Sequence, residues 1–124
     1  MSKFTAQIEA FNEKLLKKVA LVRKDVAVQL FTDIIEDTPV DTGRAKGNWY
    51  ASLNAPIRAI GVHDSLSAVA KMNYGTDEDI YLTNNLPYIV RLEYGYSKKS
   101  PQGMVRKNVA RFEQIFKEAL MKIK

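Results

Sequence analysis

Apolar residues recur every three or four positions along the first third of the chain. The set comprises Phe4, Ile8, Phe11, Leu15, Val19, Val22, Val26, Leu30 and Ile34. This spacing places them on one face of an amphipathic helix. Ser2 is a candidate N-cap, and we expect the helix to end near Thr38, because the residue before Pro39 is pushed out of the α region. A helix of about 33 residues is ~50 Å long.

A helix of that length exceeds the width of a domain of 124 residues, which leaves two alternatives. In one, an end of the helix projects beyond the domain, and its apolar stripe needs a partner chain. In the other, the helix bends or breaks at the polar cluster Arg23–Asp25, and the whole stripe is intramolecular core. The spacing does not choose between them.

Two later segments alternate between apolar and polar residues, which is typical of strands with one buried face. In 49–53, Trp49, Ala51 and Leu53 share a side, and 80–83 repeats the pattern. The segment 57–60 is a candidate for another short strand.

The region between the two predicted strands also contains a candidate helix. Asp64 or Ser65 is placed to cap it at its N-terminus. Gly75 is the candidate C-terminal cap, because glycine readily adopts the left-handed conformation that ends a helix.

The stretch from Ile80 to Arg106 combines the second strand with a tight corner. Asn84–Asn85 ends the strand, and Pro87 suits the first turn of a short helix whose buried side includes Tyr88 and Leu92. Gly95 ends this helix and a loop to Gly103 follows. A final helix of about 20 residues is predicted from Val105, Val109, Phe112, Phe116, Leu120 and Ile123. The fold class is α+β: a long N-terminal helix and a C-terminal helix packed on a small, mostly antiparallel sheet, in one domain of residues 1–124.

Composition narrows the function classes only slightly. The chain has no cysteine, which excludes a disulfide framework and a thiolate metal site. Charged residues interrupt the first 18 positions, so these are expected to be neither signal peptide nor membrane span. The net charge of +5 suits nucleic acid, an anionic surface or an acidic partner, and it equally suits solubility alone. Cations on the first helix (Lys14, Lys17, Lys18, Arg23 and Lys24) are expected to form a solvated face.

Candidate catalytic and metal-binding residues lack partners in the sequence. His63 is the only histidine and is expected at the surface, and 77–79 is an acidic turn without the spacing of a calcium loop. Asp41-Thr42-Gly43 occurs once, whereas an aspartic protease needs two such carboxylates. Glu93, close to Arg91, suggests an ion pair or a structural hydrogen bond. We therefore expect no enzyme, no cofactor and no bound metal.

An ordered set of short motifs resembles the tail-completion, head–tail joining proteins of tailed bacteriophages, the minor tail components of HK97- and lambda-like phages. The motifs are D-T-G-R (41–44), N-W (48–49), N-N-L-P-Y (84–88), L-E-Y-G (92–95) and S-x-x-x-P-x-G-M (97–104), followed by an amphipathic helix. The matching positions are Asp41, Gly43, Arg44, Trp49, Asn85, Tyr88, Glu93, Gly95, Pro101 and Gly103.

The resemblance implies a structural virion protein, made in the bacterial cytoplasm, that forms a ring of six copies in the neck of the particle. Its partners would be further copies, the head connector or adaptor proteins, and the tail terminator or tail tube. The matching residues, with Pro87 and Tyr94, would shape the subunit and its contacts. A tail terminator, or a basic nucleic-acid-binding module, is the alternative.

Four cations are candidates for the channel through which DNA passes. Lys98 and Lys99 lie at a loop tip, and Arg44 and Lys46 lie in the glycine-rich segment before the first strand. Only weak contact with DNA is expected, because tight binding would impede ejection. The aromatic residues Tyr81, Tyr88, Tyr94, Tyr96 and Trp49 are candidates for a subunit interface, where aromatics and arginine are enriched.

Overall fold

The chain has an α+β fold, as predicted. The computed structural model describes residues 3–40, 43–75, 77–94 and 103–122. Its elements are α1 (Lys3–Glu36), the 3-10 helix η1 (Lys46–Asn48), β1 (Trp49–Leu53), α2 (Ser65–Lys71), β2 (Ile80–Asn84), α3 (Ile89–Glu93), α4 (Val105–Val109) and α5 (Phe112–Lys122). The predicted cap Ser2 lies outside the described residues.

The long helix α1 is continuous, so the predicted break at Arg23–Asp25 does not occur. The helix continues through this polar cluster, and the Arg23 guanidinium donates a hydrogen bond to the Glu78 carbonyl oxygen. The helix ends where the sequence predicted. The Thr38 hydroxyl donates to the Ile34 carbonyl oxygen at 2.8 Å, which satisfies one of the last carbonyl groups of the helix.

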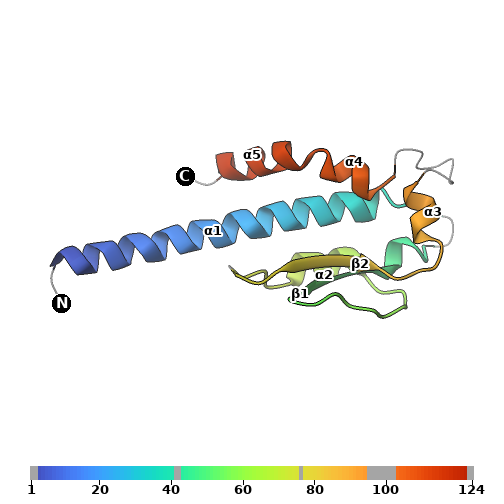
Figure 1. Ribbon diagram of the computed structural model, residues 1–124, viewed down its shortest axis with the longest axis horizontal. Helices are drawn as coiled ribbons and strands as arrows, with labels where there is room; N and C mark the ends of the chain where they lie inside the picture. The colour runs from blue at the N-terminus through green and yellow to red at the C-terminus, as the bar shows by residue number, and fades with distance from the viewer. Residues whose placement is uncertain (1–2, 41–42, 76, 95–102, 123–124) are drawn as a thin grey trace.

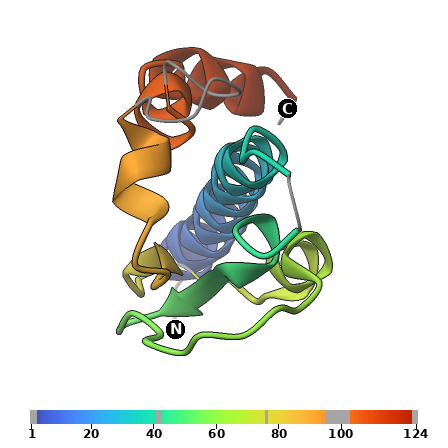
Figure 2. The same ribbon diagram turned by 90° about the vertical axis from the view of Figure 1, so that its right-hand side faces the viewer.

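Three layers are stacked along α1. The helices α4 and α5 lie on one side of α1, and the sheet with α2 lies on the other (Figure 1). Figure 2 shows α3 joining the two outer layers along one side of α1. The core also joins the start of α4 to the sheet, because Met104 and Trp49 belong to one buried cluster.

The core fills the space between α1, the sheet, α2 and the start of α4. Its buried members are Ala27, Phe31, Ile34, Ile35, Trp49, Val69, Tyr74 and Met104. A smaller cluster joins Val26 of α1 to Ile115 and Ala119 of α5. Every buried residue of α1 comes from its C-terminal part, between Val26 and Ile35.

The two strands pair antiparallel, with Trp49 opposite Asn84 and Leu53 opposite Ile80. The described residues contain no third strand, so the suggested strand at 57–60 is wrong. Side chains hold that segment instead. The Asn85 amide nitrogen donates to the carbonyl oxygens of Ile57 and Ala59, at 2.8 and 3.1 Å.

The predicted cap of α2 is present, because the Asp64 carboxylate accepts a hydrogen bond from the Ser67 amide at 3.1 Å. The predicted cap at Gly75 is wrong: α2 ends at Lys71. The chain then folds back on the helix, and the buried Tyr74 hydroxyl donates to the Val69 carbonyl oxygen at 2.6 Å.

The predicted final helix is divided into α4 and α5 by a turn at 110–111. The division lets each piece bury a different face. Asn108 of α4 is fully buried, and its amide nitrogen donates to Asp37 and to the Met104 carbonyl oxygen, both at 2.8 Å. In α5 the buried residues are Ile115 and Ala119.

The apolar stripe of the final helix was predicted to be buried, and that prediction is wrong for most of its described residues. Val109, Phe112, Phe116 and Leu120 are all exposed. The buried positions are instead Asn108, Ile115 and Ala119, which the predicted stripe does not include. Pro87 also lies outside the short helix, because α3 begins at Ile89 with Tyr88 as its N-cap residue.

Candidate functional site

The corner between α3 and α4 is built around one carboxylate, that of Glu93. Its oxygens accept hydrogen bonds from the backbone amides of Met104, Val105 and Arg106 at 2.8–2.9 Å. The Arg106 guanidinium adds a bond at 3.0 Å. The first amides of a helix have no partner within it, so Glu93 at the end of α3 supplies the cap that α4 lacks.

These bonds favour the charged form of Glu93. Burial raises the pKa of this carboxyl, but the amides of Arg106, Val105 and Met104 and the Arg106 side chain together lower it by more, so the pKa lies below its usual range. The predicted structural hydrogen bond is thus present, with Arg106 rather than Arg91 as the cation. The role of Glu93 is to fix the direction of α4.

Gly103 permits this arrangement. Its φ is +81°, a conformation that favours glycine, and a Cβ there would lie 2.5 Å from the Glu93 carbonyl oxygen. Gly43 also has a positive φ, +77°, but has open space around it. Both glycines have a left-handed backbone, and of the two only Gly103 is also closely packed.

Two tyrosines of the corner have an arginine beside the ring. The Arg106 guanidinium lies 4.6 Å from the centre of the Tyr94 ring, and that of Arg44 lies 5.9 Å from the Tyr88 ring. Tyr94 is 62% exposed and Tyr88 is half-buried. Among the predicted interface aromatics that the structure describes, Tyr94 is therefore the most exposed.

Trp49 is not available as an interface residue. It is buried in the core, and its indole nitrogen donates to the Thr38 hydroxyl at 2.9 Å. His63, expected at the surface, is half-buried: its ring stacks on Tyr50 at 4.2 Å, and its Nε2 lies 2.6 Å from the Trp49 carbonyl oxygen. The sequence did not indicate this stacking, because the two rings are 13 positions apart and belong to no regular pattern.

The remaining predicted site residues are dispersed. Asn85 holds the 57–60 segment, Pro87 is exposed before α3, and Lys46 begins η1, which directly precedes β1. Further predicted residues lie outside the described ranges: Asp41, Gly95, Tyr96, Lys98, Lys99 and Pro101.

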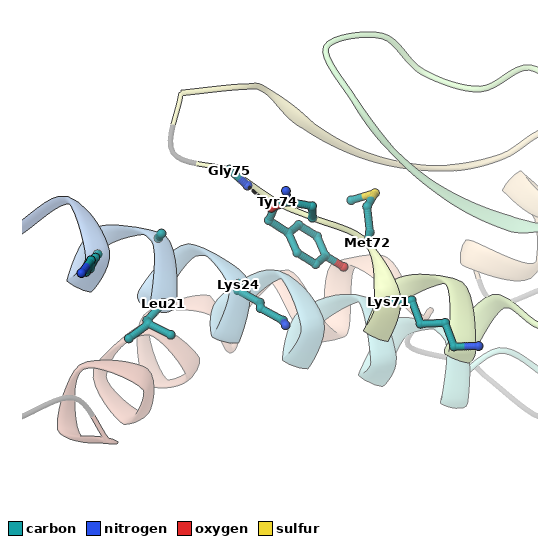
Figure 3. A pocket seen from close by; sticks show the side chains of 9 residues that line it. Leu21, Lys24, Lys71, Met72, Tyr74 and Gly75 are labelled. Carbon is teal, nitrogen blue, oxygen red and sulfur yellow. Dashed lines mark hydrogen bonds between the residues drawn. The ribbon is translucent and has the colours of Figure 1, made fainter. Parts of the chain in front are cut away.

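An open pocket of about 530 Å³ lies between α1 and the segment that leaves α2 (Figure 3). Lys17, Lys24 and Lys71 line it together with apolar side chains, including Leu21 and Met72. Burial raises the pKa of the neighbouring Tyr74 hydroxyl to about 12, so it remains protonated. The sequence predicted a solvated basic face here; the structure adds Lys71 from α2 to that face.

The N-terminal half of α1 is not covered by any other described element. Every residue from Lys3 to Lys17 is exposed, including Phe4 (69%) and Phe11 (65%). Figure 1 shows this half extending beyond both α5 and the sheet. Of the two alternatives for the long helix, the projecting one is correct.

Within the described ranges, no group of three or more His, Asp or Glu side chains could hold a metal ion. Over the same ranges, no helix is both long enough and apolar enough to cross a membrane.

Comparison with known proteins yields no match to this chain among protein-family models, curated proteins or solved structures. The family resemblance carried by its short motifs therefore remains a prediction.

Proposed function

We propose that the chain is a structural subunit of the neck of a tailed phage, where copies form a ring that completes the tail and joins it to the head connector. The observation that carries the proposal is the projecting half of α1. An apolar stripe on a helix that extends beyond its own domain needs another chain to cover it. The motif resemblance supplies the identity of the assembly.

The corner supports the same role. The capped junction of α3 and α4 is held by four hydrogen bonds to one carboxylate, and it presents Tyr94 and Arg106 at the surface. Aromatic and arginine side chains are enriched at the centres of protein interfaces. A rigid corner with such side chains suits a contact with a neighbouring virion protein.

Complementation tests this role. Particles of the phage that encodes the chain would be made without it, and purified protein would then be added to the separated heads and tails. We expect unjoined heads and tails without the protein and joined, infectious particles after its addition. Joined and infectious particles without it would reject the neck role; tubes of uncontrolled length would indicate a tail terminator instead.

A second candidate, a basic nucleic-acid-binding module, is favoured by the three lysines around the pocket between α1 and α2. Its test is the salt dependence of duplex binding, because each phosphate contact displaces counterions. A steep loss of affinity with salt that disappears in the triple variant Lys17→Gln, Lys24→Gln, Lys71→Gln, which removes the pocket lysines, would favour it. A flat response would remove it.

A further inference from the structure

Three apolar side chains on the bare half of α1 form a short ridge: Phe4, Ile8 and Phe11. Their spacing of i, i+4 and i+7 puts them on one face. All three are exposed, at 44% or more. Further along the helix the same face carries Val22 and Val26, which pack with Ile115 and Ala119 of α5. The ridge therefore lies on the same face of α1 as the residues that α5 covers, in a part of α1 that α5 does not cover.

The same chain contains an apolar groove that nothing in the described residues fills. It has a volume of about 280 Å³, and its lining includes Val26 and Phe31 of α1, Ile80 of β2, and Phe112 and Phe116 of α5, with Arg23 of α1 as the one charged lining residue. Phe112 and Phe116 belong to the α5 face that the sequence predicted to be buried and that is exposed instead. The exposed apolar face of α5 therefore forms one wall of this groove.

The ridge and the groove agree in length. Phe4 and Phe11 are separated by ~10 Å along the helix axis, and the α1 side of the groove, from Val22 to Phe31, extends ~13 Å at 1.5 Å per residue. An amphipathic helix with anchors at i, i+4 and i+7 is a common occupant of such a groove. The ridge and the α1 side of the groove lie on the same continuous helix, so the ridge cannot enter the groove of its own copy.

The uncovered apolar surface supplies part of such a contact. A fully exposed aromatic side chain presents ~200 Å². The exposed fractions of Phe4, Ile8, Phe11 and Leu15 thus amount to roughly 400 Å² on the ridge side. Those of Phe112, Phe116, Leu120 and Met121 give roughly the same area on the side of α5. Each is about half of the ~800 Å² that one partner contributes to a standard interface.

We propose that the ridge of one copy occupies the groove of a second copy, head to tail. Each copy then uses its ridge on one neighbour and its groove on the other. Such a heterologous contact forms a closed ring if the rotation between copies closes, and an open filament if it does not. The contact itself is independent of the virion, but its assignment to a ring in the neck rests on the proposed function.

The test uses the full chain in variants of each surface, with mass measured by light scattering. The ridge variant is Phe4→Asp with Phe11→Asp, and the groove variant is Phe116→Asp. A matched control for the ridge is Ala6→Asp with Ala10→Asp, which adds the same charges to the opposite face of the same exposed helix. Gln114→Asp, on an exposed position of α5, is the control for the groove.

We expect wild type and both controls to form oligomers, and the ridge and groove variants each to be monomeric with unchanged helical circular dichroism. An equimolar mixture of the two variants should form a 1:1 dimer and stop there, because one intact ridge and one intact groove remain. Wild-type protein that stays monomeric at all accessible concentrations would overturn the proposal. So would a groove variant that still oligomerises, since ridge-to-ridge pairing would then be the contact.

A second measurement covers the case in which Phe116→Asp does not fold. The chain has no cysteine, so Phe11→Cys in one copy and Phe116→Cys in another provide a single defined pair. Rapid disulfide formation in the mixture, exceeding that of either variant alone, supports head-to-tail docking. Its absence, with both variants folded, contradicts it.

The outcomes also separate the docking from the neck role. Head-to-tail oligomers in solution, combined with particles that assemble without the protein, remove the neck role and retain the docking. A ridge variant that still joins heads to tails as efficiently as wild type removes the docking and retains the neck role.

Discussion

The two halves of α1 carry one apolar stripe but have different surroundings. From Val22 onward, the stripe contacts α5 on one side and the sheet core on the other. From Lys3 to Lys17 it contacts solvent. Both halves are helical, because the periodicity and the residue types are the same and because a helix propagates readily from an ordered turn. The difference teaches that amphipathic spacing specifies a helix and the face to be covered, but not the element that covers it.

The largest effect is expected in the covered half. Ile35 is fully buried, with 0% exposure. Replacing it by alanine removes buried methyl groups and leaves a cavity, which should lower the free energy of unfolding by about 2–5 kcal/mol. Urea denaturation followed by circular dichroism measures this. A loss below about 1 kcal/mol would show that the two halves of α1 differ less than their burial indicates.

The next largest effect concerns the corner that holds α4 against the covered half. Gly103→Ala forces a side chain into a left-handed backbone and against the Glu93 carbonyl oxygen. The backbone strain alone costs about 1–3 kcal/mol. Gly43→Ala is the matched control, because it has a similar φ and open space. Equal losses of stability in the two variants would mean that the close approach to Glu93 is unimportant.

Replacing Glu93 by glutamine should cost about 1.5–3 kcal/mol at neutral pH, because hydrogen bonds to a charged group are lost. The effect depends on pH with a definite sign. The folded-state pKa of Glu93 is lowered, so its contribution is complete above the ordinary value of 4.5 and is lost as the pH falls through the lower folded value.

The difference in unfolding free energy between wild type and Glu93→Gln should therefore be constant from pH 7 to about pH 5 and shrink below it. Glu113→Gln, which removes an exposed pair with Lys117, is the control and should change stability by only ~0.5 kcal/mol. A Glu93→Gln difference that persists unchanged at pH 2–3 would contradict the assignment.

The smallest effect is expected in the bare half. Ile8→Ala changes the same residue type on the same helix as Ile35→Ala, but Ile8 makes no core contact in the described structure. Its cost in the isolated subunit should lie within about 0.5 kcal/mol. Denaturation at low protein concentration measures it. A rise in cost with protein concentration would show that assembly supplies the missing burial.

Local patterns predicted the elements better than their packing. The two strands, the end of α1 shortly before Pro39 and the Asp64 cap follow from residues near one another in sequence. The cap of α4 does not, because Glu93 lies 10 positions or more before the amides that it binds. The turn that divides α4 from α5 depends on Asn108 meeting Asp37, a contact across 71 positions.

The candidate site shows the same limit. The motif residues Glu93 and Gly103 were identified from sequence, but only their packing shows that one caps a helix and the other makes room for it. Trp49 was a candidate for an interface or for shaping the subunit; it lies in the core, where its indole nitrogen has an internal partner in Thr38. The groove between α1, β2 and α5 involves three separate segments and has no signature in any of them.

The sequence by itself determined that the chain has a long first helix, two short strands and a helical C-terminus, because each depends on periodicity and on local caps. It also determined that the first helix has one apolar face. The tertiary structure decided how much of that face is covered. Burial depends on which distant elements pack against each part of the helix: α5 packs against α1 at Val22 and Val26, and none of the described residues buries the part from Lys3 to Lys17. The ridge at Phe4, Ile8 and Phe11 is exposed for that reason.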